Sequence, residues 1–143
     1  MLFRSYRGKN IDIVIGLTPG GGYDAYARLI GRFLPRYIPG SPTVTPKNMP
    51  GAGSRAAASF VYSVAPKDGT SIAAVPRDIP FAPLMNLAGG RFDAEKLSYV
   101  GTPTIDTNVC LAMARSKVKS IADLKEHDLI VGSVGTEIGR AHV

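Results

Sequence analysis

A strand that runs through a glycine-rich turn directly into a helix is the feature that most constrains this chain. Residues 11–17 (IDIVIGL) are mostly β-branched and apolar, as in a strand that is buried on both faces of a parallel sheet. The turn TPGGGYD follows at 18–24, and an apolar helical pattern begins at Ala25. Glycine lets the backbone approach a ligand closely, and a helix N-terminus presents N–H groups without partners. The stretch therefore predicts an anion-binding turn.

The candidate ligand-binding residues of this first turn are all of its residues after Thr18. They are Pro19, Gly20, Gly21, Gly22, Tyr23 and Asp24. Proline fixes the entry to the turn, and we expect Asp24 to cap the helix by accepting hydrogen bonds from its first N–H groups. A tight strand–helix connection without a ligand is the plain alternative, because many such loops contain glycine.

A dinucleotide site is the second alternative, and with it the function of a nucleotide-dependent oxidoreductase with a Rossmann-like domain. Gly20, Gly22 and Ala25 fit the pattern G-x-G-x-x-G/A after a strand. A Rossmann unit also places an acidic residue about 20 residues further on to hold the ribose. Residues 43–49 contain Lys47 and no acid, so half of the signature is missing. A P-loop is excluded, because no Gly-Lys-Ser/Thr follows the glycines.

The helix after the first turn is expected to bury its large apolar side chains. These recur at helical spacing and are Leu29, Ile30, Phe33, Leu34 and Ile38. Arg28, Arg32 and Arg36 lie four residues apart, as on a solvated face. Pro35 should kink or shorten the last turn. The next strand, over 43–47, can be only a short or edge strand, because Pro46 cannot donate to a ladder.

A second glycine turn, NMPGAGS at 48–54, precedes another helix. Its candidate ligand-binding residues are Asn48, Gly51, Ala52 and Gly53, and a purely structural turn is an equal alternative. In the helix expected over 55–64, the side chains of Phe60, Val61 and Val64 are expected to face the interior. A turn at 66–69 and a strand over 70–75 follow.

This order of elements predicts an α/β fold with a parallel sheet and right-handed crossovers. Ligands of such sheets lie beyond the carboxyl ends of the strands, where both glycine turns are expected. Further along, we expect a short helix over 81–87, strands at 97–101 and 109–114, and a helix over 121–126 after a capping box. A last strand from Leu129 enters a third small-residue turn with Ser133 and Thr136.

Composition excludes several classes of function. The chain has 143 residues, 45% of them hydrophobic, and a net charge of +6. No apolar run approaches the roughly 18 residues of a membrane span, and the basic residues are scattered, so we expect no nucleic-acid partner. Cys110 is expected to be a packing thiol, and His127 to lie at a helix end. Without a catalytic or metal-binding motif, the sequence predicts no enzyme, no metal site and no cofactor.

Four motifs together carry a resemblance to a known family. They are GLTPGGGYD at 16–24, ARL at 27–29, NMPGAG at 48–53 and APKDGT at 65–70. In this order and spacing they resemble the Bug-type substrate-binding receptors of tripartite tricarboxylate transporters, over about residues 6–136. The resemblance implies a periplasmic-binding-protein-like (type II) fold, a mostly parallel sheet with flanking helices and an incomplete second lobe. It implies a first lobe over 1–104 and the start of the second over 105–136.

The resemblance also implies the function. Bug receptors bind a small mono-, di- or tricarboxylate in the periplasm, mostly through backbone amides, and pass it to the transporter's membrane components. The matching loops here are 19–24, 48–53 and 133–136. In three places the chain departs from the family: Ser54 stands where glycine usually continues, Pro46 interrupts a strand, and Tyr23 replaces a small hydroxyl residue. We expect a monomer at full length.

Both ends are expected to be incomplete or foreign. Residues 137–143 (EIGRAHV) match the translation of a common sequencing adapter, so we expect the natural sequence to stop near Thr136. The first residues contain no apolar segment and no cleavage site of a signal peptide.

Overall fold

The computed structural model describes residues 6–84, 90–105 and 111–129. The chain divides into two compact units, Met1–Tyr99 and Val100–Val143. Each is considered by itself below. No helix of the described residues is both long and apolar enough to cross a membrane.

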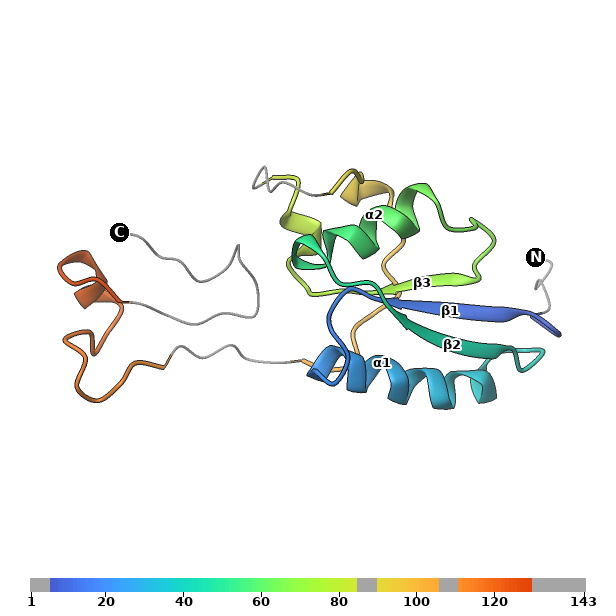
Figure 1. Ribbon diagram of the computed structural model, residues 1–143, viewed down its shortest axis with the longest axis horizontal. Helices are drawn as coiled ribbons and strands as arrows, with labels where there is room; N and C mark the ends of the chain where they lie inside the picture. The colour runs from blue at the N-terminus through green and yellow to red at the C-terminus, as the bar shows by residue number, and fades with distance from the viewer. Residues whose placement is uncertain (1–5, 85–89, 106–110, 130–143) are drawn as a thin grey trace. The chain divides into compact units, whose positions relative to one another are not determined.

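The first unit contains a three-stranded parallel sheet between two helices (Figure 1). Its strands are β1 (Asn10–Ile15), β2 (Thr43–Asn48) and β3 (Ser71–Ala74), in the order β2-β1-β3. Helix α1 (Gly22–Phe33) lies on one face, against β1 and β2, and α2 (Arg55–Ser63) lies on the other, against β1 and β3. The predicted α/β fold with a parallel sheet is confirmed.

The central strand β1 forms the core of this unit. Ile11, Ile13, Val14 and Ile15 are all buried, although alternate residues point to opposite faces of the sheet. Burial on both faces explains the nearly continuous apolar sequence, and each buried side chain stabilises the fold by about 1.5–3 kcal/mol. The strand ends at Ile15, so the two residues predicted to continue it already belong to the next loop.

The strand β2 lies at an edge of the described sheet, as Pro46 predicts. Thr43 donates to the carbonyl of Lys9 and Met49 to the carbonyl of Ile15, so the odd-numbered residues face β1. Pro46 therefore directs its nitrogen to the open edge, where no ladder hydrogen bond is lost. It pairs in register with Ile13, and the strand continues unbroken to Asn48.

The prediction for the buried face of α1 was wrong. The helix buries Asp24, Ala27 and Gly31 against the sheet, whereas Leu29 is 52% exposed. Ile30 and Phe33 are also exposed. The cause is close packing at Gly31, where an added Cβ would lie 3.2 Å from Cγ1 of Val44. Small residues face the sheet because larger ones would not fit at this separation.

A short 3₁₀ segment ends α1, as the proline in this region predicts. Helix α1 stops at Phe33, and η1 (Leu34–Tyr37) follows with Pro35 near its start. Arg32 and Arg36 place their guanidinium carbons 5.7 and 5.1 Å from the centre of the Phe33 ring. The arginine side chains therefore cover part of the exposed aromatic face of the helix.

The helix α2 buries two alanines, Ala57 and Ala58, together with Arg55 at its start. Phe60 and Val61 are half-buried. Val64 lies just beyond the helix and is 70% exposed, so the expected inward face was wrong for Val64. The face that packs on the sheet therefore includes small alanine side chains.

The connection between α2 and β3 is fixed by side chains. Gly69 has a φ of +85° in the predicted turn. Oδ1 of Asp68 accepts hydrogen bonds from the N–H and the hydroxyl of Thr70, at 3.1 and 2.6 Å. Lys9 pairs with the same carboxylate at 3.4 Å, which ties the turn to the start of β1. The predicted turn and strand are confirmed, with β3 shorter than expected.

The rest of the first unit is mostly irregular. After β3 come the short 3₁₀ segments η3 (Ile79–Phe81) and η4 (Ala94–Lys96). The helix predicted over 81–87 is not found in its described part: η3 ends at Phe81 and residues 82–84 form a turn, whereas residues 85–89 lie outside the described ranges. The strand predicted at 97–101 was wrong: the segment is irregular, and no described strand lies beside it to supply hydrogen bonds.

The described part of the second unit contains one short 3₁₀ segment. This segment is η5 (Ala122–Lys125). Asp123 accepts hydrogen bonds from the N–H groups of Lys119 and Ser120, both at 2.7 Å, which is the acidic arm of the predicted capping box. The helix is shorter than predicted. Residues 111–113 form no strand, and Cys110, Ser133 and Thr136 lie outside the described residues.

Candidate functional site

Two loops meet beyond the carboxyl ends of β1 and β2. The first, residues 16–21, leads into α1, and the second, residues 49–54, leads through η2 (Ala52–Ser54) into α2 (Figure 1). The hydroxyl of Ser54 donates to the carbonyl of Gly16 at 2.9 Å, and Nδ2 of Asn48 donates to the carbonyl of Leu17 at 3.0 Å. The structure therefore brings together the two glycine turns that the sequence singled out.

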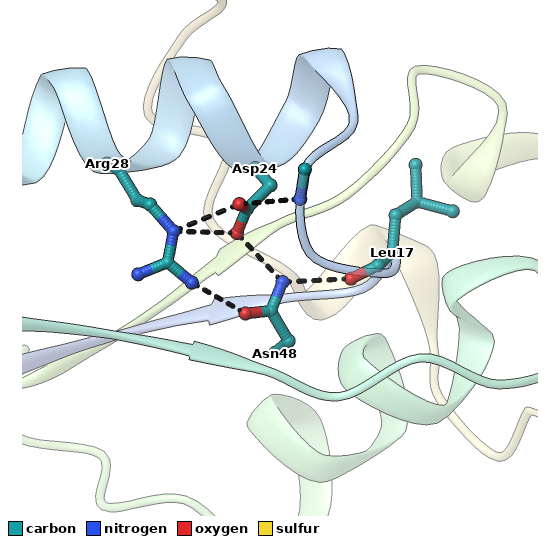
Figure 2. A network of polar contacts seen from close by, with 5 residues as sticks. Leu17, Asp24, Arg28 and Asn48 are labelled. Carbon is teal, nitrogen blue, oxygen red and sulfur yellow. Dashed lines mark hydrogen bonds and ion pairs between the residues drawn. The ribbon is translucent and has the colours of Figure 1, made fainter.

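Polar side chains from α1 and β2 form a network next to the first loop (Figure 2). The carboxylate of Asp24 accepts hydrogen bonds from the N–H of Gly20 at 3.0 Å and from Nε of Arg28 at 2.9 and 3.0 Å. Nδ2 of Asn48 donates to the same carboxylate at 2.9 Å, and Nη2 of Arg28 donates to Oδ1 of Asn48 at 2.7 Å. Residues from the loop, from α1 and from β2 are thus joined.

The charges in this network compensate each other. Hydrogen bonds from Arg28, then from the Gly20 N–H and the Asn48 amide, hold the pKa of Asp24 well below its usual range. The carboxylate in turn raises the pKa of Arg28. Asp24 is 6% exposed, so its charge is taken up by these partners rather than by water. The pair adds no net charge to the site.

The predicted capping role of Asp24 was wrong. The residue before the helix is Gly21, no side chain caps α1, and Asp24 is the third residue of the helix. Its carboxylate reaches back to the N–H of Gly20 instead of forward into the first turn. Within the described part of the chain, the N–H groups of Gly22, Tyr23 and Asp24 have no hydrogen-bond partner. These are the donors that a helix start leaves over.

The glycines of the first loop differ in what the fold requires of them. Gly20 has a φ of +86°, which favours glycine. A Cβ on Gly22 would meet no atom within 4 Å, and one on Gly21 would meet only the carbonyl of Thr18 at 3.8 Å. Neither packing nor backbone conformation requires glycine at these two positions. Their lack of side chains leaves the N–H groups of the first turn open to a ligand.

The flanking residues of the first loop are also exposed. Pro19 is exposed, and Tyr23 is 37% exposed at the second position of α1. Tyr23 is therefore accessible on the surface at the start of the helix. Of the six residues predicted for the first turn, residues 19–23 are thus exposed and Asp24 is buried beneath them.

The second loop adopts a strained backbone. Ala52, Gly53 and Ser54 have φ values of +47°, +59° and +72°, after Gly51 at +148°. Left-handed conformation costs a residue with a side chain roughly 1–2 kcal/mol, and such strain gathers at functional sites. The N–H groups of Ala52 and Gly53 have no partner among the residues that the structure covers. These N–H groups belong to one tight turn, and successive N–H groups of a turn can bind an anion.

Gly16 and Ser54 hold the two loops in contact. Ser54 is fully buried, and a Cβ on Gly16 would lie 2.4 Å from Cβ of Ser54. Glycine at 16 is therefore required by the close approach of the second loop. The serine that departs from the family pattern takes the positive φ that glycine favours, and its hydroxyl satisfies the buried carbonyl of Gly16.

Sequence analysis missed three contributors: Arg28, Gly16 and Ser54. Arg28 was assigned to a solvated face, although an acid and an arginine four residues apart on a helix are a recognised pairing signal. Asn48 was expected at the site, but both hydrogens of its amide are already donated, to Leu17 and to Asp24. Its side chain supports the loops instead of offering donors to a ligand.

The remaining predicted features lie elsewhere. A hollow of about 410 Å³ in the second unit is lined by Leu111, Met113 and Leu129 among others, and includes no candidate residue. No group of three or more metal-ligating side chains occurs within residues 6–84, 90–105 and 111–129. Ser133 and Thr136, the third predicted loop, cannot be placed, since they fall outside these ranges.

The chain was also compared with known proteins. No protein-family model and no curated protein matches its sequence.

Proposed function

We propose that this protein is a substrate-binding receptor for a small carboxylate, of the Bug type that serves tripartite tricarboxylate transporters. One observation carries the proposal: two loops at the carboxyl edge of the sheet lie in contact, and each presents backbone N–H groups without partners among the described residues. Backbone donors at a helix start and in a left-handed turn suit a carboxylate oxygen.

The charge distribution supports a binding role. Asp24 and Arg28 compensate each other, so recognition falls to uncharged backbone donors. Such a site orients an anion and releases it unchanged, as a receptor requires. Among the described residues, the hydrogen bonds of these loops include neither a second carboxylate nor a histidine, and we propose no enzymatic activity.

The strand order favours the receptor over the dinucleotide alternative. In a Rossmann fold the first three strands have the order 3-2-1, so β1 and β3 are not neighbours, whereas β1 lies between β2 and β3 here. The missing ribose acid points the same way. A central β1 also occurs in flavodoxin-like sheets, which bind a phosphate-bearing cofactor at the same edge. The binding test therefore includes nucleotides.

The proposal extends to the whole receptor. Residues 1–104 belong to a first lobe of a type II periplasmic-binding-protein fold, and 105–136 begin a second lobe whose loop, with Ser133 and Thr136, completes the site. The receptor works in the periplasm as a monomer and delivers its ligand to the membrane components of the transporter. These statements rest on the motifs at 16–24, 27–29, 48–53 and 65–70.

Calorimetric titration tests the proposed ligand class. Acetate, succinate and citrate represent mono-, di- and tricarboxylates, and NADH and FMN represent the alternatives. We expect saturable binding of at least one carboxylate and none of either nucleotide. Nucleotide binding without a carboxylate response would overturn the proposal, as would the absence of binding to every probe at millimolar concentration.

Two glycine variants separate binding from folding. Gly22→Ala places a methyl group in open space beside the N–H groups, so it should weaken carboxylate binding without loss of stability, since alanine is the better helix former by about 1 kcal/mol. Gly20→Ala should instead destabilise the fold, because its φ is +86°. Unchanged affinity in the Gly22→Ala variant would show that the ligand does not approach this turn.

A further inference from the structure

Arg28 joins two side chains, Asp24 and Asn48, that are each bound to the first loop. Its side chain is 47% exposed, yet Nε is bound to both oxygens of Asp24 and Nη2 is bound to Asn48. Figure 2 shows the guanidinium beside both partners, with dashed lines to the Asp24 carboxylate and to the Asn48 amide. Asn48 is the last residue of β2, directly before the second loop, and also binds the first loop at Leu17. One arginine thus connects α1, the first loop and the start of the second.

We infer that Arg28 and Asn48 are positioning residues, which hold the N–H groups of Gly22, Tyr23 and Asp24 in a fixed place relative to the second loop before any ligand binds. The chain of contacts runs from Arg28 to Asp24 to the N–H of Gly20, and from Arg28 to Asn48 to the carbonyl of Leu17. That these N–H groups bind a carboxylate rests on the proposed function, whereas their positioning by Arg28 and Asn48 does not.

The hydrogen-bond inventory argues against direct ligand contacts by these side chains. Asp24 carries a negative charge and would repel a carboxylate. Both amide hydrogens of Asn48 are donated, and its oxygen accepts from Arg28. If Arg28 turned to a ligand, Asp24 would lose its main partner while it stays buried.

The planar fork of arginine is what this position needs. Two nitrogens of one guanidinium bind a carboxylate and an amide oxygen in one plane. A lysine ammonium is a point charge and cannot hold both acceptors at these positions. Arg28→Lys should therefore behave more like Arg28→Gln than like the natural protein.

Amide hydrogen exchange of the ligand-free chain tests the positioning role. In Arg28→Gln and in Asn48→Ala, the N–H of Gly20 should exchange about tenfold faster, because its acceptor is no longer held in place. The carboxyl carbon of Asp24, followed by NMR in Arg28→Gln, should titrate at a higher pH. Arg32→Gln is the matched control, since Arg32 contacts the Phe33 ring instead, and should leave both signals unchanged.

Titration with succinate then separates the two proposals. Arg28→Gln and Asn48→Ala should each weaken binding about tenfold, with a smaller combined loss than the product of the two, because both act through one network. Unchanged Gly20 exchange would overturn the positioning role, and weaker binding with unchanged exchange would show that Arg28 contacts the ligand. Faster exchange in a protein that binds no carboxylate would uphold the positioning role and overturn the proposed function.

Discussion

Among single residues, Asp24 shows how a buried charge can serve the geometry of a loop. A carboxylate near the N-terminus of a helix normally stabilises the helix through its attraction to the positive end of the helix dipole. Here it is paired with Arg28 and binds the N–H of Gly20, so the first turn of α1 keeps N–H groups available. The side chain therefore fixes the loop without consuming the donors that we assign to the ligand.

Acid should destabilise the protein through this residue. The folded state lowers the pKa of Asp24 below its ordinary value, so Asp24 contributes stability that is fully present above about pH 4 and is lost as the pH falls below it. We expect the stability difference between the natural protein and Asp24→Asn to shrink between pH 5 and pH 2 in urea unfolding. A difference that stays constant over this range would show that the carboxylate is not held by its partners.

Part of the acid dependence should survive in that variant. Hydrogen bonds from Thr70 lower the pKa of Asp68, and hydrogen bonds from the N–H groups of Lys119 and Ser120 lower that of Asp123. Asp68→Asn is the matched comparison, because it removes a titrating carboxylate from a turn outside the candidate site.

The contact between Gly16 and Ser54 predicts a non-additive pair of variants. Gly16→Ala should cost about 1–3 kcal/mol, because its methyl group would overlap the Ser54 side chain. Ser54→Gly removes that side chain, so Gly16→Ala should cost clearly less in the double variant. Denaturant unfolding of the four proteins measures the coupling. Additive costs would mean that the two loops do not touch at this point.

Residue-level prediction from sequence succeeded where one local rule decides. The glycine turns were found because strand–turn–helix patterns are local. The capping role of Asp24 was mispredicted because the helix starts at Gly22, three residues before the expected start at Ala25. Ser54 and Gly16 were missed as partners because their contact joins segments that are 38 residues apart.

Among the elements, α1 is the one that departs most from expectation. Its large apolar residues form an exposed stripe, and its small ones face the sheet. Periodicity identified the helix but not its orientation, because a stripe of Asp24, Ala27 and Gly31 carries little hydrophobic signal. The edge position of β2 could be predicted, since the missing N–H of Pro46 constrains a strand wherever it lies.

A pair of variants tests the orientation of α1. Gly31→Leu should destabilise the fold by about 1–3 kcal/mol through crowding against Val44, although leucine is the better helix former. Leu29→Ala should change stability by no more than about 0.5 kcal/mol, because Leu29 is exposed. The opposite ranking in thermal or urea unfolding would place the apolar stripe against the sheet.

For the whole molecule, the account rests on the first unit. Its helices against the sheet and its two loops at one edge follow from the alternation of strand and helix along the chain, whereas the strand order β2-β1-β3 does not. The parallel α/β class could be predicted for that reason. The irregular segment at 97–101 could not, because a strand needs a neighbour that the local sequence does not specify.

The most direct test of the central claim is an NMR titration of the backbone amides with succinate. We predict saturable shifts of the N–H signals of Gly22, Tyr23 and Asp24 and of Ala52 and Gly53, with the N–H signals of η5 unchanged as an internal reference. NADH should shift none of them. Shifts of these amides with NADH but not with succinate, or no response of either loop to millimolar succinate, would contradict the account.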